Sequence, residues 1–394
     1  MPGYLLRSII RKLPGVVIKA VPKPEVKVTE GFGSREKAAD LCSGYGYSKV
    51  LVLTDRTLFS LGFHELVCRS LERNGISYAV FSDIASEPTT EIVDNGRKAA
   101  MECGAQCIIA LGGGSVMDAG KMIAAGVRLK KINEHFLLLK FLFVPDKTLP
   151  IINIPSTAGT GAETTVGAVI TDTVLKVKSS TVIVGLNVTD VILDSELTVG
   201  APRIVTAACG IDALSHGLEG CVADVSVASQ YMVQSRECVK LVLENLPRVL
   251  ENPEDLDARN AMCRAAYYGG VAINIQLAGY VHAFAHSIGA TYHIPHGQAI
   301  ALCLMPVMRH QGARCARELD RTAQHCGMAS GDELLEAIER LVGMCGFEKR
   351  GEFIERKDYW HLTRLISKDS INYSAPVTLK DSEIHEILDK INSL

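Results

Sequence analysis

Short runs of apolar residues alternate with stretches of helical periodicity over the first half of the chain. The apolar runs, which are rich in β-branched residues, predict strands at 49–54, 77–82, 106–111 and 150–155. Between them, apolar positions three and four residues apart predict helices at 65–74, 91–103 and 115–129. Nearly continuous apolar strands that alternate with helices are typical of a parallel sheet covered by helices on both faces.

Three more apolar runs predict strands at 167–172, 181–186 and 190–194. The pattern changes after residue 193. From there on, amphipathic windows predict helices at 227–246, 260–275, 333–345 and 381–391. The segment 198–204 contains Gly200 and Pro202 and is a candidate linker. We therefore expect an α/β domain at 1–197 and a helical domain at 198–394.

Composition adds limits on location and partners. The chain has 394 residues, of which 47% are hydrophobic, so it can bury the cores of two domains. A net charge of −3 gives no reason to expect nucleic acid as a partner. No segment has the roughly 18 consecutive apolar residues of a membrane helix. The twelve cysteines are scattered and none lies in a CxxC pair, which favours reduced thiols and a cytoplasmic protein.

The first part of the chain is basic, because its first acidic residue is Glu25. Within it, apolar residues recur at helical spacing, with Arg7 and Arg11 among them. This pattern is compatible with a targeting peptide, with a helix on a membrane surface, or with a helix docked on the protein or on a partner subunit. We favour the docked helix, because the stretch is short and has no clear cleavage signal.

Three loops that follow predicted strands are candidates for binding a nucleotide. The sequence GGGSVMD (112–118) follows a strand and opens a helix, and its glycines and helix N-terminus suit a pyrophosphate. Asp55 follows the strand at 49–54, where an acid can bind ribose hydroxyls, although it can equally cap a helix. The third loop, with Ser156, Thr157 and Thr160, can line a cofactor or be a simple turn.

Histidines and one carboxylate form the strongest chemical signal. Asp212 and His216 are four residues apart, as are His282 and His286, and a helix places such pairs on one face. His296 follows Pro295 at a predicted helix break. One carboxylate with several imidazoles suits Fe(II) or Zn(II). The spacing predicts a metal site but does not distinguish His282 from His286 as a ligand.

Together these motifs resemble the iron-containing alcohol dehydrogenase family. The match runs from about Val26 to the C-terminus and comprises GGGSVMD (112–118), PSTAGTGAETT (155–165), GIDALSHGLEG (210–220) and HAFAHSIGATYHIPHG (282–297). The resemblance implies an N-terminal parallel-sheet dinucleotide-binding domain and a C-terminal helical metal-binding domain, an architecture shared with the dehydroquinate synthases. It also implies a homodimer.

The resemblance assigns roles to individual residues. It implies that the metal ligands are Asp212, His216, His282 and His296. It places His286 near the nicotinamide, where it can relay a proton. The residues that it matches to cofactor contacts are Asp55, Gly112, Gly113, Gly114, Ser115, Asp118, Thr157 and Thr160. The implied reaction interconverts a small alcohol and its aldehyde or ketone by hydride transfer with NAD(H) or NADP(H).

Some segments depart from the family pattern and leave the substrate open. Residues 371–378 stand where relatives often have Asn-Pro-Arg, Ile273 stands where some have an aromatic residue, and 131–147 is unusually apolar for a loop. Two alternatives remain. One is a metal- and NAD-dependent lyase of the 3-dehydroquinate synthase type, which needs a basic phosphate pocket. The other is a metal- or nucleotide-binding protein without activity.

Overall fold

A computed structural model describes residues 26–85, 87–129, 141–174, 177–224, 229–348, 351–370 and 373–393. By their contacts, the described residues form two compact units. Residues 26–157 and 161–200 make an α/β unit, and residues 158–160 and 201–393 make a helical unit. The basic segment before Glu25 lies outside the described residues, so the helix expected there stays a prediction.

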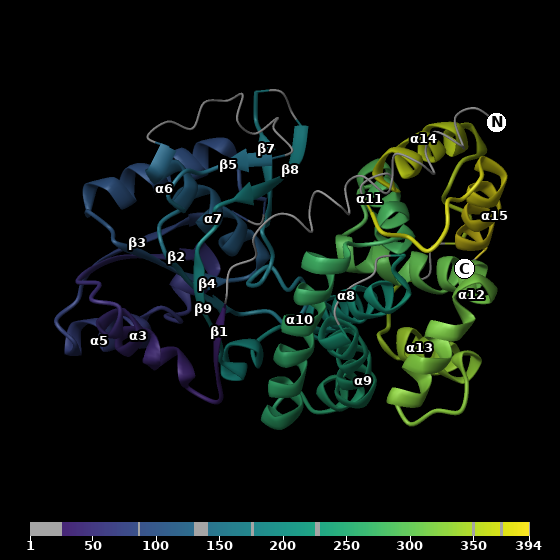
Figure 1. Cartoon of the computed structure of the whole chain (residues 1–394), viewed down its shortest axis with the longest axis horizontal. Coiled ribbons are helices and arrows are strands. Elements are labelled where there is room, and N and C mark those ends of the chain that lie inside the picture. Colours follow the sequence, from purple (N-terminus) through teal and green to yellow (C-terminus); the bar gives the residue numbers. More distant parts are fainter. Residues whose placement is uncertain are drawn as a thin grey trace. The chain divides into compact units, whose positions relative to one another are not determined.

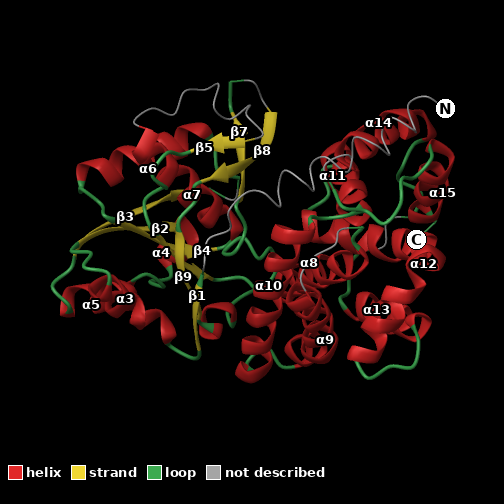
Figure 2. Ribbon diagram, in the orientation of Figure 1, coloured by secondary structure: helices red, strands yellow, loops and turns green. Residues whose placement is uncertain are grey.

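A parallel sheet forms the centre of the α/β unit (Figure 2). Its strands, in spatial order, are β1 (Lys27–Glu30), β9 (Val188–Leu193), β6 (Ile151–Pro155), β4 (Cys107–Gly112), β2 (Lys49–Asp55) and β3 (Ser77–Ile84). Every neighbouring pair is parallel. The predicted parallel sheet is confirmed. The edge strand β1 was not predicted, because its short, mostly exposed sequence KVTE has no apolar run.

Helices cover both faces of this sheet, as the alternation of side chains along each strand requires (Figure 1). On one face, Val50 and Val52 join a buried cluster with residues of α3 (Ala38–Gly44) and α5 (Glu65–Arg73). On the other face, α7 (Gly114–Leu129) lies so close that a Cβ at Gly120 would be 3.3 Å from Leu53. The helix α6 (Thr90–Glu102) packs beside α7.

A second, smaller sheet is joined to α7 through a buried ion pair. Its strands are β5 (Phe141–Phe143), β8 (Val177–Val184) and β7 (Gly167–Asp172). The Lys121 ammonium, fully buried, lies 3.0 Å from Asp118 Oδ1 and donates to the Gly167 carbonyl at 2.7 Å. Asp118 Oδ2 accepts the Val169 amide at 2.9 Å. The contacts of Asp118 therefore fasten β7 to α7.

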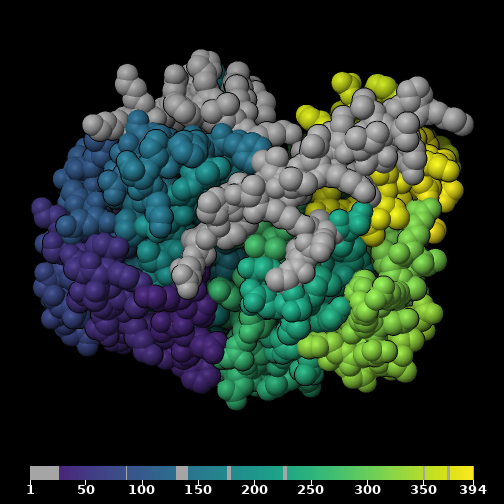
Figure 3. Space-filling view, in the orientation of Figure 1, coloured from purple at the N-terminus to yellow at the C-terminus, as the bar shows by residue number. Residues whose placement is uncertain are grey.

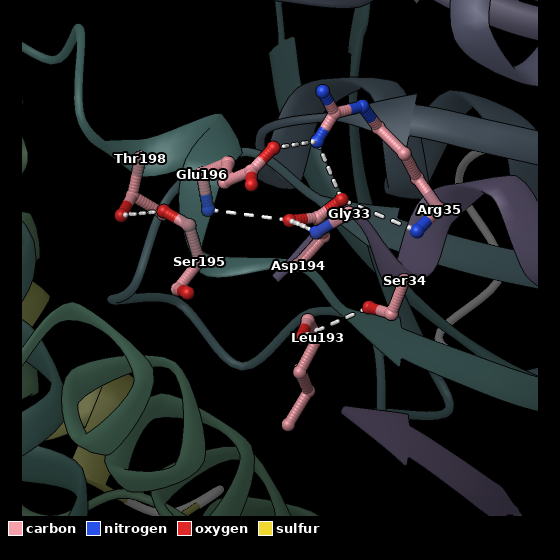
Figure 4. A network of polar contacts seen from close by, with 8 residues as sticks. All are labelled: Gly33, Ser34, Arg35, Leu193, Asp194, Ser195, Glu196 and Thr198. Carbon is pink, nitrogen blue, oxygen red and sulfur yellow. Dashed lines mark hydrogen bonds and ion pairs between the residues drawn. The ribbon is translucent and has the colours of Figure 1, made fainter. Parts of the chain in front are cut away.

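A dense polar network closes the carboxyl end of β9 (Figure 4). The Asp194 side chain is fully buried and begins the short helix η3 (Ser195–Thr198). Its carboxylate accepts the backbone amides of Gly33 and Glu196 at 3.1 and 3.2 Å, and the amide of Arg35 at 3.2 Å. The Arg35 guanidinium adds a contact of 2.5 Å. These bonds tie η1 (Ser34–Lys37) to β9, and Figure 3 shows residues 26–60 in purple on the surface of this unit.

In the part of the chain that the structure describes, the second unit contains only helices and the loops that connect them. The helices are α8 (Arg203–Val222), α9 (Ser229–Glu251), α10 (Leu256–Gln276), α11 (Tyr280–Tyr292), α12 (His296–His325), α13 (Gly331–Met344), η4 (Arg356–Asp358), α14 (Tyr359–Ser370) and α15 (Asp381–Asn392). The four predicted windows correspond to α9, α10, α13 and α15. The helix break before His296 is also confirmed, because α11 ends at Tyr292. No helix of the described residues is both long and apolar enough to cross a membrane.

Candidate metal and cofactor sites

The helix α8 carries two of the predicted metal ligands and is buried on nearly all sides. Asp212 and His216 are one turn apart, and both are less than a tenth exposed. Glycines on this helix let neighbouring helices come close. A Cβ at Gly217 would lie 2.9 Å from the Ser235 carbonyl of α9 and 2.9 Å from Cys238 Sγ. Close packing against α9 thus fixes the position of α8 and of its polar side chains.

His282 and His296 approach α8 from two further helices. His282 lies in the first turn of α11 and is buried. The left-handed conformation of His293, with φ of 53°, ends α11, and α12 then begins at His296. A Cβ at Gly297 would lie only 2.6 Å from Ala208 Cβ. Because glycine has no Cβ, the start of α12 can rest directly on α8.

Three imidazole nitrogens converge on a single carboxylate oxygen. His296 Nε2, His216 Nε2 and His282 Nε2 lie 3.3, 3.5 and 3.6 Å from Asp212 Oδ1. Neighbouring ligands of a tetrahedral ion with bonds near 2.1 Å are about 3.3–3.6 Å apart. Asp212, His282 and His296 also form a group whose ligand atoms all lie within 4.8 Å of one another. The spacing of these atoms therefore fits one divalent cation.

Hydrogen bonding supports the same fit. Asp212 Oδ1 and His282 Nε2 are buried and have no hydrogen-bond partner among the described residues. An unpaired buried polar atom costs about 1–3 kcal/mol, and such atoms are rare in folded proteins. A cation between them would satisfy both atoms. His296 differs from the other three, because its side chain is 44% exposed.

The electrostatics of the cluster separate its histidines. Burial lowers the pKa of His216 to about 4, so this ring is neutral at neutral pH. Burial alone would raise the pKa of Asp212, but the His216 and His296 imidazoles hold it well below its usual range. Burial would also lower the pKa of His282, yet Glu219 and Asp212 raise it to about 10. A cation must therefore displace a proton from His282.

His286 lies one turn beyond His282 and occupies a different environment. It is exposed, and its ring centroid is 5.2 Å from that of His296. Its Nδ1 is 3.0 Å from the Tyr373 hydroxyl. The group whose ligand atoms all lie within 4.8 Å of one another contains His282 but neither His286 nor His216. His216 Nε2 is nonetheless 3.5 Å from Asp212 Oδ1. Burial raises the pKa of Tyr373 well above its usual value, so this hydroxyl keeps its proton.

The cofactor candidates of the α/β unit gather at one edge of the sheet. Parallel strands direct their carboxyl ends to the same edge, and Asp55, Gly112 and Pro155 end the neighbouring strands β2, β4 and β6. The Ser156 amide donates to the Gly112 carbonyl at 2.9 Å. The nearest atom to a Cβ at Gly113 would be Thr157 Oγ1, at 3.7 Å. This edge is where ligands of open α/β sheets bind.

The glycine-rich turn opens α7, as the sequence indicates. Gly114 and Ser115 are its first residues, and the first N–H groups of a helix have no acceptor within that helix. A Cβ at Gly112 would lie 2.5 Å from Val116 Cγ2, so this glycine is required by packing. Asp55 Oδ1 accepts the Leu58 amide at 2.9 Å and caps the short helix α4 (Arg56–Ser60).

Two predicted cofactor residues lie apart from this group. Asp118 is one turn inside α7 and contacts Lys121 and the Val169 amide, as described above. Thr160 belongs by its contacts to the helical unit. In the same short segment, a Cβ at Gly159 would lie 2.7 Å from Cys209 Cα. The contacts of α8 thus extend to this segment.

Two models of one protein family together cover most of the chain. The model described as iron-containing alcohol dehydrogenase matches residues 24–195, and the model of the family's C-terminal domain matches 206–392. The chain belongs to the iron-containing alcohol dehydrogenase family. The sequence-based assignment of an NAD-linked, iron-dependent oxidoreductase that interconverts alcohols and aldehydes is confirmed by this membership.

Known relatives agree with the family. The chain is 34% identical over 270 residues to an NAD-dependent methanol dehydrogenase of Bacillus methanolicus, a match that covers 68% of this chain and 69% of the relative. It is 29% identical to alcohol dehydrogenase 4 of Saccharomyces cerevisiae (strain YJM789), over 91% of this chain and 95% of the relative. These matches support the oxidoreductase and give no support to the lyase alternative.

Solved structures agree with the fold. A sulfoacetaldehyde reductase from Bifidobacterium kashiwanohense, in complex with NAD⁺, has a TM-score of 0.87 and 26% identity, over 95% of this chain and 98% of its own. A 1,3-propanediol oxidoreductase has a TM-score of 0.85 and 26% identity, over 94% of this chain and 99% of its own. The predicted combination of a parallel-sheet domain with a helical domain is therefore confirmed.

The sequence patterns did not predict two residues that contact histidines of this site. Glu219 was part of the quoted motif GIDALSHGLEG, but its i+7 spacing from Asp212 was not used. Tyr373 lies in the stretch that departs from the family's Asn-Pro-Arg pattern, which was its one available signal. Both contact a histidine across a long sequence separation, and no local pattern encodes such a contact.

Proposed function

We propose that Asp212, His216, His282 and His296 hold the catalytic metal of this alcohol dehydrogenase. The observation that carries the proposal is the convergence of three imidazole nitrogens on the buried, unpartnered Asp212 Oδ1. Carboxylate and imidazole ligands suit Fe(II), which the family name implies, and they also accept Zn(II). When bound, such an ion supplies a Lewis acid that polarises the oxygen of the substrate.

The protein's own groups orient the reactants and move a proton. Oxidation of an alcohol removes a hydride, which the nicotinamide receives, and a proton from the hydroxyl group. We assign that proton to His286, because an imidazole titrates near neutral pH and this ring is exposed. The Tyr373 hydroxyl, 3.0 Å from His286 Nδ1, orients this ring.

The sheet edge supplies the proposed cofactor site. Gly112, Gly113, Gly114 and Ser115 bind the pyrophosphate at the N-terminus of α7, and Thr157 lies beside this turn. Asp55 accepts hydrogen bonds from the ribose hydroxyls and repels a 2′-phosphate, which favours NAD over NADP. Asp118 contributes by holding β7 on α7. Thr160 is proposed as a cofactor contact by its match to the family motif. Residues 1–197 thus serve as the dinucleotide-binding domain and 198–394 as the catalytic domain.

The relatives and the cysteines support three further points. The relatives named above act on methanol, sulfoacetaldehyde and 1,3-propanediol, so we propose a small alcohol or aldehyde as the substrate. All twelve cysteines are free, which supports a reducing compartment such as the cytoplasm. We propose a homodimer by likeness to the family, and light scattering after gel filtration measures its mass.

Metal analysis combined with a substrate screen tests the proposal. His282→Ala and His296→Ala are compared with the wild-type protein by elemental analysis, and His310→Ala serves as a control. His310 belongs to the same unit but contacts the largely buried Glu383 of α15. We expect the first two variants to lose the metal and the control to keep it. The wild-type protein should form reduced nicotinamide with small alcohols, whereas full metal occupancy in either His→Ala variant would refute the ligand assignment.

A further inference from the structure

Glu219 lies directly behind one of the proposed metal ligands. It is on α8, two turns after Asp212, and is buried. Its Oε2 is 2.5 Å from His282 Nδ1, and its Oε1 accepts the Val281 amide at 2.7 Å. Both oxygens of one carboxylate are therefore used by the first turn of α11, which carries His282.

These contacts determine which nitrogen of His282 is protonated. An ionised carboxylate has only acceptor atoms, so the Nδ1 that faces Glu219 must carry a hydrogen and donate it. The other nitrogen, Nε2, is the one that lies 3.6 Å from Asp212 Oδ1 and has no hydrogen-bond partner among the described residues. A neutral ring protonated at Nδ1 presents its Nε2 lone pair to a cation.

The surrounding backbone leaves room for this carboxylate. A Cβ at Gly279, the residue that precedes α11, would lie 2.7 Å from Glu219 Oε1. Any other residue at this position would displace the carboxylate or the start of the helix. The carboxylate also faces the N-terminus of α11, where free N–H groups and the helix dipole favour a negative charge.

We infer that Glu219 is a positioning residue of the metal centre, which fixes His282 in the tautomer and orientation that bind the cation. The inference rests on the proposed metal site. Carboxylates that accept the second ring N–H of a ligating histidine orient that ring and raise its basicity, and their loss lowers metal affinity roughly 10–100-fold. Both oxygens of Glu219 contact the first turn of α11, so it acts through His282.

A glutamine at this position separates the positioning role from a purely structural one. The Gln side chain has nearly the same shape, and its single oxygen can still accept the Val281 amide. Its NH₂ group then faces His282 Nδ1 and favours the tautomer with hydrogen on Nε2, whose lone pair is then not available to the cation. A helix-capping role alone would survive Glu219→Gln, whereas the positioning role would not.

The experiment measures Co(II) affinity by competition with a chelator on the metal-free full-length protein. We expect Glu219→Gln to raise the dissociation constant roughly 10–100-fold and to alter the visible spectrum of bound Co(II). The matched control is Glu237→Gln, which removes another Glu–His contact of the helical unit, 2.8 Å from His325 Nε2. We expect this control to bind Co(II) as the wild-type protein does.

A second variant tests whether the lost charge alone explains the result. Gly279→Ala keeps the charge of Glu219 but moves its carboxylate, so we expect weaker Co(II) binding here too. Thermal unfolding of the metal-free variants reports any structural role, because a purely structural role would lower the melting temperature and leave the Co(II) affinity unchanged. Wild-type affinity in Glu219→Gln, or in Gly279→Ala, would overturn the inference.

The outcomes for Glu219 and for the metal site are distinguishable. If the wild-type protein binds one Co(II) tightly and Glu219→Gln binds it equally well, the inference fails and the metal site stands. If the wild-type protein binds no Co(II), or if Asp212→Asn binds it normally, the proposed metal site itself fails.

Discussion

Asp194 in the α/β unit and Asp212 in the helical unit are both buried carboxylates, yet their surroundings are opposite. Asp194 accepts three backbone amides and contacts the Arg35 guanidinium. Asp212 directs an oxygen without a hydrogen-bond partner among the described residues towards three imidazole nitrogens. The first carboxylate has all its donors in the protein, whereas one oxygen of the second has no donor within hydrogen-bonding distance among the described residues.

This difference distinguishes a structural acid from a binding acid. A buried carboxylate with a full set of donors is already stabilised and has nothing left to offer a ligand. A carboxylate oxygen that faces imidazole nitrogens without a hydrogen bond gains a partner when a cation joins them. Substituting asparagine at both positions therefore provides a matched test, because the two side chains have the same shape and differ in charge.

The largest effect is expected for Asp212→Asn. The amide cannot supply the charge that holds a cation among three imidazoles, so we expect loss of the metal and a fall in turnover of about 10³-fold or more. The metal-free variant should lose less stability than Asp194→Asn. Elemental analysis and the rate of NADH formation measure the first expectation, and retained metal with retained activity would contradict it.

Asp194→Asn should act on folding. The amide places a donor against Arg35, and breaking a buried ion pair of this kind costs about 3 kcal/mol. Chemical denaturation measures this loss as a lower unfolding midpoint. Metal content per folded molecule should stay at the wild-type value, since Asp194 lies in the other unit. A variant that is as stable as the wild-type protein would show that the network in Figure 4 is dispensable.

Metal uptake should depend on pH through His282. The pKa of this ring is about 10 in the metal-free protein, above its ordinary value near 6.5, so a cation displaces one proton at neutral pH. The apparent affinity should rise about tenfold per pH unit between pH 6 and 8. The same shift stabilises the metal-free fold at low pH, and this stabilisation is lost as the pH rises towards 10. Affinities that do not change with pH would contradict the first expectation.

Asp55 uses one oxygen within the protein and, in the proposed function, also binds a ligand, so it combines the roles of Asp194 and Asp212. Its substitution is expected to have the smallest effect. One of its oxygens accepts the Leu58 amide as a helix cap. Glycine is nearly as good a cap, so Asp55→Gly should cost only a few tenths of a kcal/mol. Removal of the charge should improve the use of NADP relative to NAD by roughly tenfold. An unchanged ratio of kcat/KM for the two cofactors would restrict Asp55 to its capping role.

Local patterns predicted much of the fold. The apolar runs anticipated β2, β3, β4 and β6 to within two residues. Strands β2, β4 and β6 are almost fully buried and need continuous apolar sequence, whereas the edge strand β3 is mostly half-buried. The sequence pattern did not by itself predict α8, since a helix that is buried on nearly all sides has no polar face and hence little periodicity. The long helix α12 was missed, and Pro306 interrupts its pattern.

The candidate site was predictable only in part. The spacing of Asp212 and His216 indicated one helix face, but His282 and His286 are equivalent in spacing and differ only in what surrounds them. Family resemblance supplied the choice between them. The contact between Glu219 and His282 depends on how α11 packs against α8, a tertiary arrangement that no window of the sequence contains.

The proposed ligands come from three helices, and the last of them, His296, begins α12. A ribosome therefore releases the α/β unit and the helices α8 to α11 before the fourth side chain emerges. Nascent chains that end before His296 lack both this imidazole and Gly297, the glycine that lets α12 rest on α8. The proposed metal site is therefore complete only after α12 has begun to emerge.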